Sequence, residues 1–211
     1  KPGVYFDEEN RRHLNSIRLA YASAAINLAS NGRKEAAKKL LTKCDNNMLE
    51  SNFSYGMISR DQQHNSISLR FLDAAIATED TALAAKVMKS LKKDLEQQMV
   101  YYASLNGTDV AKLNADINGL FSRQEMYERA TDSLNFVRPA NFQAQINQIR
   151  YQQNNDMVNF RENLSKKLGP LYDDMLSCYQ ILDNVKTKEN SLKAPKPSLM
   201  EPPVVSDTPA K

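Results

Sequence analysis

Apolar side chains recur along this chain at spacings of three and four residues, the period that stacks side chains on one face of an α-helix. Seven successive segments show this spacing. They are separated at Gly32, at residues 49–61, 79–81 and 106–107, at Pro139, and at the pair Gly169 and Pro170. The pattern predicts an all-α fold of seven helices.

The first two segments are joined by almost no linker. Asp7 is a good N-cap for the first helix, and Gly32 is a good terminator for it. The second helix is predicted over residues 33–48. A connection this short requires the two helices to fold back as an antiparallel hairpin. The apolar spacing predicts the inward face of the first helix as Leu14, Ile17, Tyr21, Ala24 and Leu28.

A second hairpin repeats the first. A shift of 48 residues places Ala84, Ala85 and Lys86 on Ala36, Ala37 and Lys38. The stretch LASNGRKEAAKKLL, residues 28–41, resembles the inter-helix turn of a tetratricopeptide repeat, in which small residues let paired helices approach closely. The repeat length is longer than usual for that family, because of the connector at 49–61. Residues 1–106 are therefore predicted to form two tetratricopeptide-like helical hairpins.

The remainder changes in composition. Residues 107–187 predict three long helices, rich in Gln and Asn, that extend the first part and pack on it. Five of the eight prolines follow residue 188, in a segment with few large apolar residues. Residues 188–211 are therefore predicted to be a proline-rich tail that does not fold alone.

The connector FSYGMISRDQQHN, residues 53–65, holds the residues that most resemble an active site. Ser59, Arg60, Asp61 and His64 include a nucleophile and a base, but no glycine-framed serine elbow accompanies them. Asp61 is expected to cap the third helix, with His64 reinforcing the cap. The connector is therefore interpreted as a structural joint, with a polar contact site or hydrolytic catalysis as the alternatives. The residues predicted to contribute to binding are Tyr55, Arg60, Asp61, His64, Asn65, Arg12 and His13.

The charge, histidine, glycine and cysteine content limits the classes of partner and cofactor that the chain is expected to bind. The chain carries 28 basic and 25 acidic residues with no dense basic block, so nucleic acid is not expected as a partner. The histidine and cysteine spacing predicts no metal site, and the single glycines predict no nucleotide loop, so no cofactor is expected. Cys44 and Cys178 are expected to be two buried thiols, with a disulfide as the alternative.

Lysines recur on the second helix of each hairpin. A solvated face is the simplest interpretation of this stripe. The alternative is contact with an anionic membrane surface through Lys38, Lys39, Lys86, Lys89 and Lys93.

No apolar run reaches the roughly 18 residues that span a bilayer, so the chain is expected to be soluble. It begins at Lys1 without a methionine or a leader, which suggests a piece of a longer product, with a processed N-terminus as the alternative.

Three stretches carry a resemblance to a family: residues 3–22, 55–65 and 92–102. They resemble the C-terminal soluble region of large Bacteroidota membrane proteins whose N-terminal part is similar to protein O-mannosyltransferases. The resemblance covers residues 3–105 well and the rest loosely. It implies that a missing N-terminal part supplies the membrane spans and any glycosyl transfer, and that this domain is extracytoplasmic, in the periplasm. It transfers no catalytic residue.

The predicted function is accordingly a non-catalytic binding or scaffolding domain of a membrane glycosyltransferase-like protein. Its expected partner is another protein or the membrane-embedded part of the same polypeptide. The alternative is an independent small enzyme or ligand-binding domain that uses the connector 55–65.

Overall fold

The computed structural model describes residues 6–193, which form seven α-helices and one short 3-10 helix and contain no strand. The all-α prediction is therefore confirmed. The elements are α1 (Glu8–Ser30), α2 (Lys34–Asn47), η1 (Arg60–Gln62), α3 (Gln63–Ala77), α4 (Thr81–Asn106), α5 (Val110–Val137), α6 (Phe142–Leu168) and α7 (Leu171–Lys193).

Aspartates begin three of these helices. The side chains of Asp7, Asp80 and Asp109 each accept a hydrogen bond from the backbone N–H three residues later, at 2.8, 3.1 and 2.7 Å. Each bond satisfies a donor that the first helical turn leaves unpaired. Gly107 ends α4 with a φ of 68°, a left-handed conformation that glycine adopts without strain.

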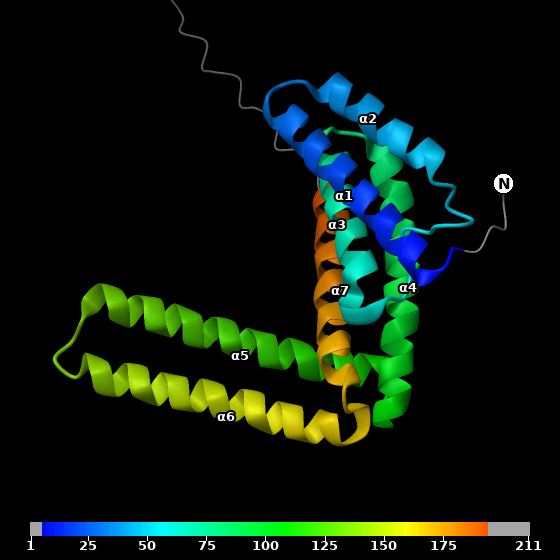
Figure 1. Ribbon diagram of the computed structural model, residues 1–211. Helices are drawn as coiled ribbons and strands as arrows, with labels where there is room; N and C mark the ends of the chain where they lie inside the picture. The colour runs from blue at the N-terminus through cyan, green and yellow to red at the C-terminus, as the bar shows by residue number, and fades with distance from the viewer. Residues whose placement is uncertain (1–5, 194–211) are drawn as a thin grey trace, which may run out of the picture.

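Five helices form the body of the molecule (Figure 1). α1 and α2 make one antiparallel pair, α3 and α4 make a second, and α1 lies across α3. α7 then runs antiparallel to α4. The two hairpins agree with the predicted organisation of the first part, and their tetratricopeptide-like character stays a prediction.

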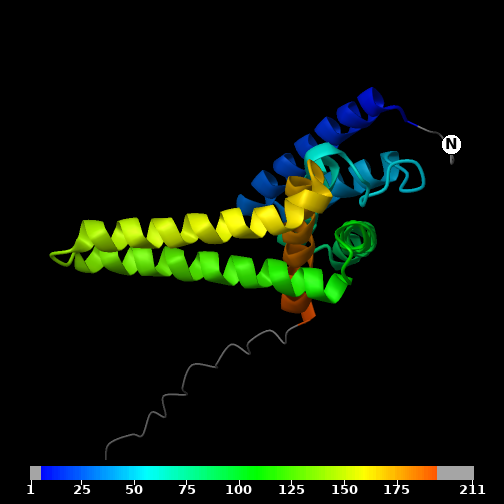
Figure 2. The same ribbon diagram turned by 90° about the horizontal axis from the view of Figure 1, so that it is seen from below.

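α5 and α6 form a long antiparallel arm that leaves the body at the end of α4 and returns beside it (Figures 1 and 2). Within the arm, Asp156 of α6 accepts hydrogen bonds from Arg123 and Tyr127 of α5, both at 3.0 Å. At its base, Lys167 Nζ donates to the carbonyl of Asn106 at 2.7 Å. The predicted three-helix extension is thus divided, because α7 packs on α4 in the body while most of α5 and α6 stands away from it.

The last helix is longer than predicted. α7 continues to Lys193, through residues that the sequence placed in the tail, and Lys188 forms an ion pair of 2.8 Å with Asp73 of α3. The rest of the predicted tail lies outside the described residues.

Small residues line the seam between the first helices. Ala22 and Ala25 of α1, Ala37 of α2, and Ala74 and Ala75 of α3 are almost completely buried. Side chains this small let the helix axes approach closely, as the sequence predicted. Larger apolar residues fill the core around the seam, including Leu41, Phe71, Leu91, Leu95 and Met175.

The predicted inward face of α1 is wrong in part. Ile17 is 46% exposed and Ala24 is exposed, while Asn15 and Arg18 are buried beside Ala22 and Ala25. The helix is rotated because the face that carries Arg18 contacts the polar connector.

Cys44 on α2 and Cys178 on α7 are both buried and free, which confirms two buried thiols. Among the helices of residues 6–193, none combines the length and the hydropathy that a membrane span requires.

Candidate functional site

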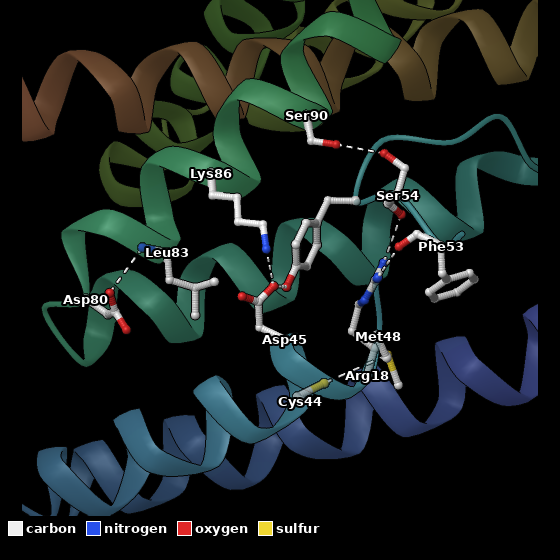
Figure 3. Close-up of polar contacts among 11 residues, drawn as sticks. Arg18, Cys44, Asp45, Met48, Phe53, Ser54, Asp80, Leu83, Lys86 and Ser90 are labelled. Atoms are coloured by element: carbon white, nitrogen blue, oxygen red, sulfur yellow. Dashed lines mark hydrogen bonds and ion pairs between the residues drawn. The ribbon is translucent and has the colours of Figure 1, made fainter. Parts of the chain in front are cut away.

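The connector between α2 and α3 is docked against α4. Ser54 and Gly56 contact the same residue of that helix, Ser90. The hydroxyls of Ser54 and Ser90 lie 2.9 Å apart (Figure 3), and the Gly56 N–H donates to Ser90 Oγ at 3.0 Å. A Cβ at Gly56 would lie 2.3 Å from the Ser90 carbonyl oxygen, so only glycine fits this approach. The connector therefore has a fixed position.

Arg18 of α1 fills the space beneath the connector and is only 1% exposed. Its guanidinium lies 4.4 Å from the ring centres of both Phe53 and Tyr55, within the range of a cation–π contact. The same group donates to the carbonyls of Phe53 and Ser54, at 3.0 and 3.3 Å (Figure 3). It also donates to Ser68 Oγ, at 3.1 Å. Burial lowers the pKa of Arg18 to about 10.

His64 is buried beside Arg18. Its Nε2 lies 2.7 Å from the Ser54 carbonyl, which can only accept, so Nε2 carries the hydrogen. Nε2 and Arg18 Nη1, which lie 3.4 Å apart, are then both donors and do not form a hydrogen bond with each other. Burial, and next the charge of Arg18, lower the pKa of His64 to about 4. At neutral pH the imidazole is uncharged and acts as a structural donor.

Asn65 connects the connector to α4 through a buried network. Its Oδ1 accepts from the Met57 N–H at 3.1 Å, and its Nδ2 donates to Gln62 and Asp94, at 2.9 and 3.0 Å. Gln98 completes the network, with hydrogen bonds of 2.6 Å to both Asp94 and Gln62. Every polar atom of the Asn65 side chain is thus used in holding the connector.

Tyr55 makes a third attachment. Its hydroxyl donates to Asp45 Oδ1 of α2 at 2.8 Å, and Lys86 of α4 donates to the same oxygen at 2.6 Å (Figure 3). Burial, together with the carboxylate of Asp45, raises the pKa of Tyr55 well above its ordinary range. The connector, α2 and α4 are joined at this carboxylate.

A groove of about 1040 Å³ opens on the outer side of this assembly, between the first turns of α1 and residues 57–66. Arg11 and Arg12 contribute from α1, and Arg60 and Asp61 from the opposite wall. Arg60 lies 3.6 Å from Asp61, but both side chains are more than four-fifths exposed, where an ion pair contributes little. Arg12 has no ion-pair partner within residues 6–193.

Asn15 contributes a further polar group to the groove. The residue is 6% exposed, and its Oδ1 has no hydrogen-bond partner among the residues that the structure describes. A buried amide without a partner is costly and uncommon, and such groups recur at binding sites. On the opposite wall, Asp61 is left-handed with a φ of 53°, and so is the next residue, the buried Gln62, with a φ of 51°. Strain of this kind in residues other than glycine is concentrated at functional positions.

The predicted site residues do not form one site. Tyr55 and Asn65 are interior attachments of the connector, and His64 is buried between that interior and the groove. The predicted residues Arg12, Arg60 and Asp61 line the groove. His13 does not line it: the side chain is exposed and lies 3.9 Å from Glu9, one turn away on α1.

The predicted capping role of Asp61 is wrong. Asp61 lies inside η1, and α3 begins two residues later, at Gln63, without a side-chain cap from Gln62. Ser59 Oγ instead accepts the N–H of His64 at 2.9 Å. The serine hydroxyl is therefore turned to the backbone, and the His64 ring is turned to the Ser54 carbonyl. The pair is arranged as a joint and does not form a nucleophile with its base.

Sequence reasoning missed the two most informative residues, Arg18 and Asn15. Both lie on the helical line Arg11, Asn15, Arg18, Ala22 and Ala25, whose spacing marks one face of α1. A charged residue aligned with small apolar residues on one helix face is a signal that finds Arg18. The unpaired Oδ1 of Asn15 has no sequence signal.

Within residues 6–193 no cluster of three His, Cys, Asp or Glu side chains is placed to hold a metal ion. Comparison of the chain with protein-family models, with curated proteins and with solved structures finds no match.

Proposed function

We propose that this chain is a non-catalytic helical binding or scaffolding domain, and that its recognition site is the groove between α1 and the connector. The observation that carries the proposal is the division of polar groups in this region. Ser59, His64 and Asn65 are held in structural hydrogen bonds, whereas Arg12, Arg60 and Asn15 present groups to the groove that the protein does not satisfy well.

A carboxylate-bearing segment of a polypeptide fits these groups. Guanidinium groups bind carboxylates through paired, charge-assisted hydrogen bonds, and Arg12 and Arg60 stand on opposite walls. The Asn15 amide complements a peptide group, and the side chains of Met57 and Ile58 offer apolar contact, since Ile58 is 62% exposed. Among residues 6–193, the groove lining includes no Phe, Tyr or Trp on which a sugar or a base would stack.

The sequence resemblance supplies the proposed context. In it, the domain is the C-terminal soluble part of a membrane glycosyltransferase-like protein on the extracytoplasmic side. The bound segment then belongs to a protein partner or to the membrane-embedded part of the same polypeptide. The two hairpins serve as a tetratricopeptide-like scaffold that holds the groove in shape.

The test is binding of a fluorescein-labelled glutamate-rich peptide, measured by fluorescence anisotropy, with a glutamine-rich peptide as the uncharged comparison. Arg12→Gln and Arg60→Gln are each expected to weaken binding of the acidic peptide about tenfold, the value of one charge-assisted contact. Arg70→Gln is the matched control, because Arg70 is exposed on α3 and does not line the groove. Equal affinity for the two peptides, or an equal loss in the control, would refute the proposal.

A further inference from the structure

A second groove lies between α4 and the end of α7, and its lining includes Lys89 and Lys93. Its volume is about 630 Å³, and its α4 wall runs from Ala85 to Val100. At 1.5 Å per residue this wall is about 22 Å long. The opposite wall comes from the last turns of α7 and includes Leu192.

The groove presents apolar side chains to solvent. Val100 is 56% exposed and Leu192 is 45% exposed, and Met88 and Ala85 lie beside them in the lining. Apolar groups gathered in one hollow favour a ligand with a hydrocarbon part.

The charges of the groove leave lysines in excess. Among the described residues, four lysines line it against two glutamates, and both glutamates already have partners within the protein. Glu189 accepts from Lys92 and Lys193, at 2.9 and 2.7 Å, and Glu96 lies 4.0 Å from Lys186, outside the groove.

Lys89 and Lys93 have no carboxylate partner within residues 6–193. They stand four residues apart on α4, where like charges repel. An anionic group placed between them removes this repulsion. Both belong to the predicted membrane-contact stripe, in which Lys86 is held by Asp45 and Lys38 lies 3.6 Å from Glu35. Lys39, the fifth member, is exposed on α2 and does not line this groove.

We propose that this groove binds an anionic lipid, with the headgroup at Lys89 and Lys93 and an acyl chain along the apolar floor toward Val100 and Leu192. An acyl chain spans one leaflet, about half of the roughly 30 Å hydrocarbon core. The α4 wall from Lys89 to Val100 is about 16 Å long at 1.5 Å per residue, which matches that length. Lysine is a suitable headgroup ligand because its ammonium is a compact charge on a flexible stem that packs on apolar surface.

The test is isothermal titration calorimetry of the full chain with three probes below their aggregation concentrations. Lysophosphatidylglycerol carries the charge and the chain, lysophosphatidylcholine carries the chain without net charge, and inorganic phosphate carries the charge alone. Lysophosphatidylglycerol is expected to bind about tenfold more tightly than either of the others. Equal binding of the zwitterionic lipid, or equal binding of phosphate, overturns the proposal, and so does a failure of lysophosphatidylglycerol to bind.

Two pairs of variants locate the site. Lys89→Gln with Lys93→Gln is expected to weaken lysophosphatidylglycerol about tenfold or more. The matched control is Lys39→Gln with Lys43→Gln, because these lysines are also exposed and four residues apart, on α2, and do not line the groove. An equal loss in the control shows general charge attraction and overturns the proposal.

The floor is tested with Leu192→Asn, which is expected to weaken the lysolipid about tenfold. Leu19→Asn is its control, since Leu19 is 39% exposed on α1, away from the groove. Unchanged lysolipid affinity in Leu192→Asn, or displacement of the lysolipid by a glutamate-rich peptide, assigns the groove to another class of ligand. The variants in these tests replace no residue that lines the groove at α1. One proposal can therefore be refuted while the other stands.

Discussion

Replacement of Gly56 by alanine is expected to destabilise the protein by about 1–3 kcal/mol, the usual cost of excess volume in a packed site. The added Cβ would lie 2.3 Å from the Ser90 carbonyl oxygen and 2.6 Å from Asp94 Cβ. Carbon–oxygen contacts normally begin near 3.3 Å, so the overlap is about 1 Å. The α4 backbone cannot move without breaking its hydrogen-bond ladder. The connector must move instead, and it then loses the 3.0 Å bond from the Gly56 N–H to Ser90 Oγ.

Urea unfolding followed by far-ultraviolet circular dichroism measures this change. Gly119→Ala is the control, because Gly119 lies inside α5 and the nearest atom to its added Cβ is Arg123 Nη1, at 3.6 Å. That variant is expected to stabilise the protein by about 0.5–1 kcal/mol, since alanine favours helix. In a thermal melt of a chain this long, each kcal/mol corresponds to about 2–4 °C. If Gly56→Ala stays within about 0.5 kcal/mol of the parent, the connector is not fixed on α4 as described.

Two further stability predictions follow from the buried polar groups. Burial holds the pKa of His64 near 4 against an ordinary 6.5, so between these values the unfolded chain binds a proton that the folded chain does not. The free energy of unfolding should therefore fall by about 3 kcal/mol as the pH is lowered through this window. His64→Gln should remove that part of the dependence in urea titrations at pH values on either side of it, and an unchanged slope would contradict the assignment. Asn65→Ala should lower the free energy of unfolding by about 2–4 kcal/mol, because it leaves Gln62 and the Met57 N–H without their partner. Asn15→Ala should lower it by less than about 1 kcal/mol. Equal losses in the same urea titrations would show that the two amides do not differ in this way.

The helices were predictable because their signals are local. Apolar spacing, the aspartate at position 7 and the glycine at position 107 depend only on neighbours in the chain, and each marks an end that the structure retains.

The inward face of α1 was not predictable from apolar spacing alone. Leu14, Ile17 and Tyr21 form a convincing stripe, yet Arg18 is the side chain that occupies the interior. Its burial depends on carbonyls at residues 53 and 54, which come from a connector about 35 positions away in the chain. A periodic pattern carries no information about such a distant partner.

The candidate site was predicted only in part, because its arrangement also depends on residues that are distant in the chain. The sequence marked residues 55–65 as polar and unusual, and several of them do line the groove. It did not separate the residues that hold the connector from those that face outward, since Asn65 and Arg60 are equally polar in the sequence. That division arises from the packing of the connector against α4, which the spacing of residues does not encode.

The arm formed by α5 and α6 can change in length without a change in the body of the molecule. α5 and α6 leave and return at one end of the body, where Lys167 is bonded to the last residue of α4. Turns added to both helices, or removed from both, would change the reach of the tip by about 5.4 Å each. The packing of α1, α3, α4 and α7 would not change. The length of the arm is therefore independent of the packing that holds the body together.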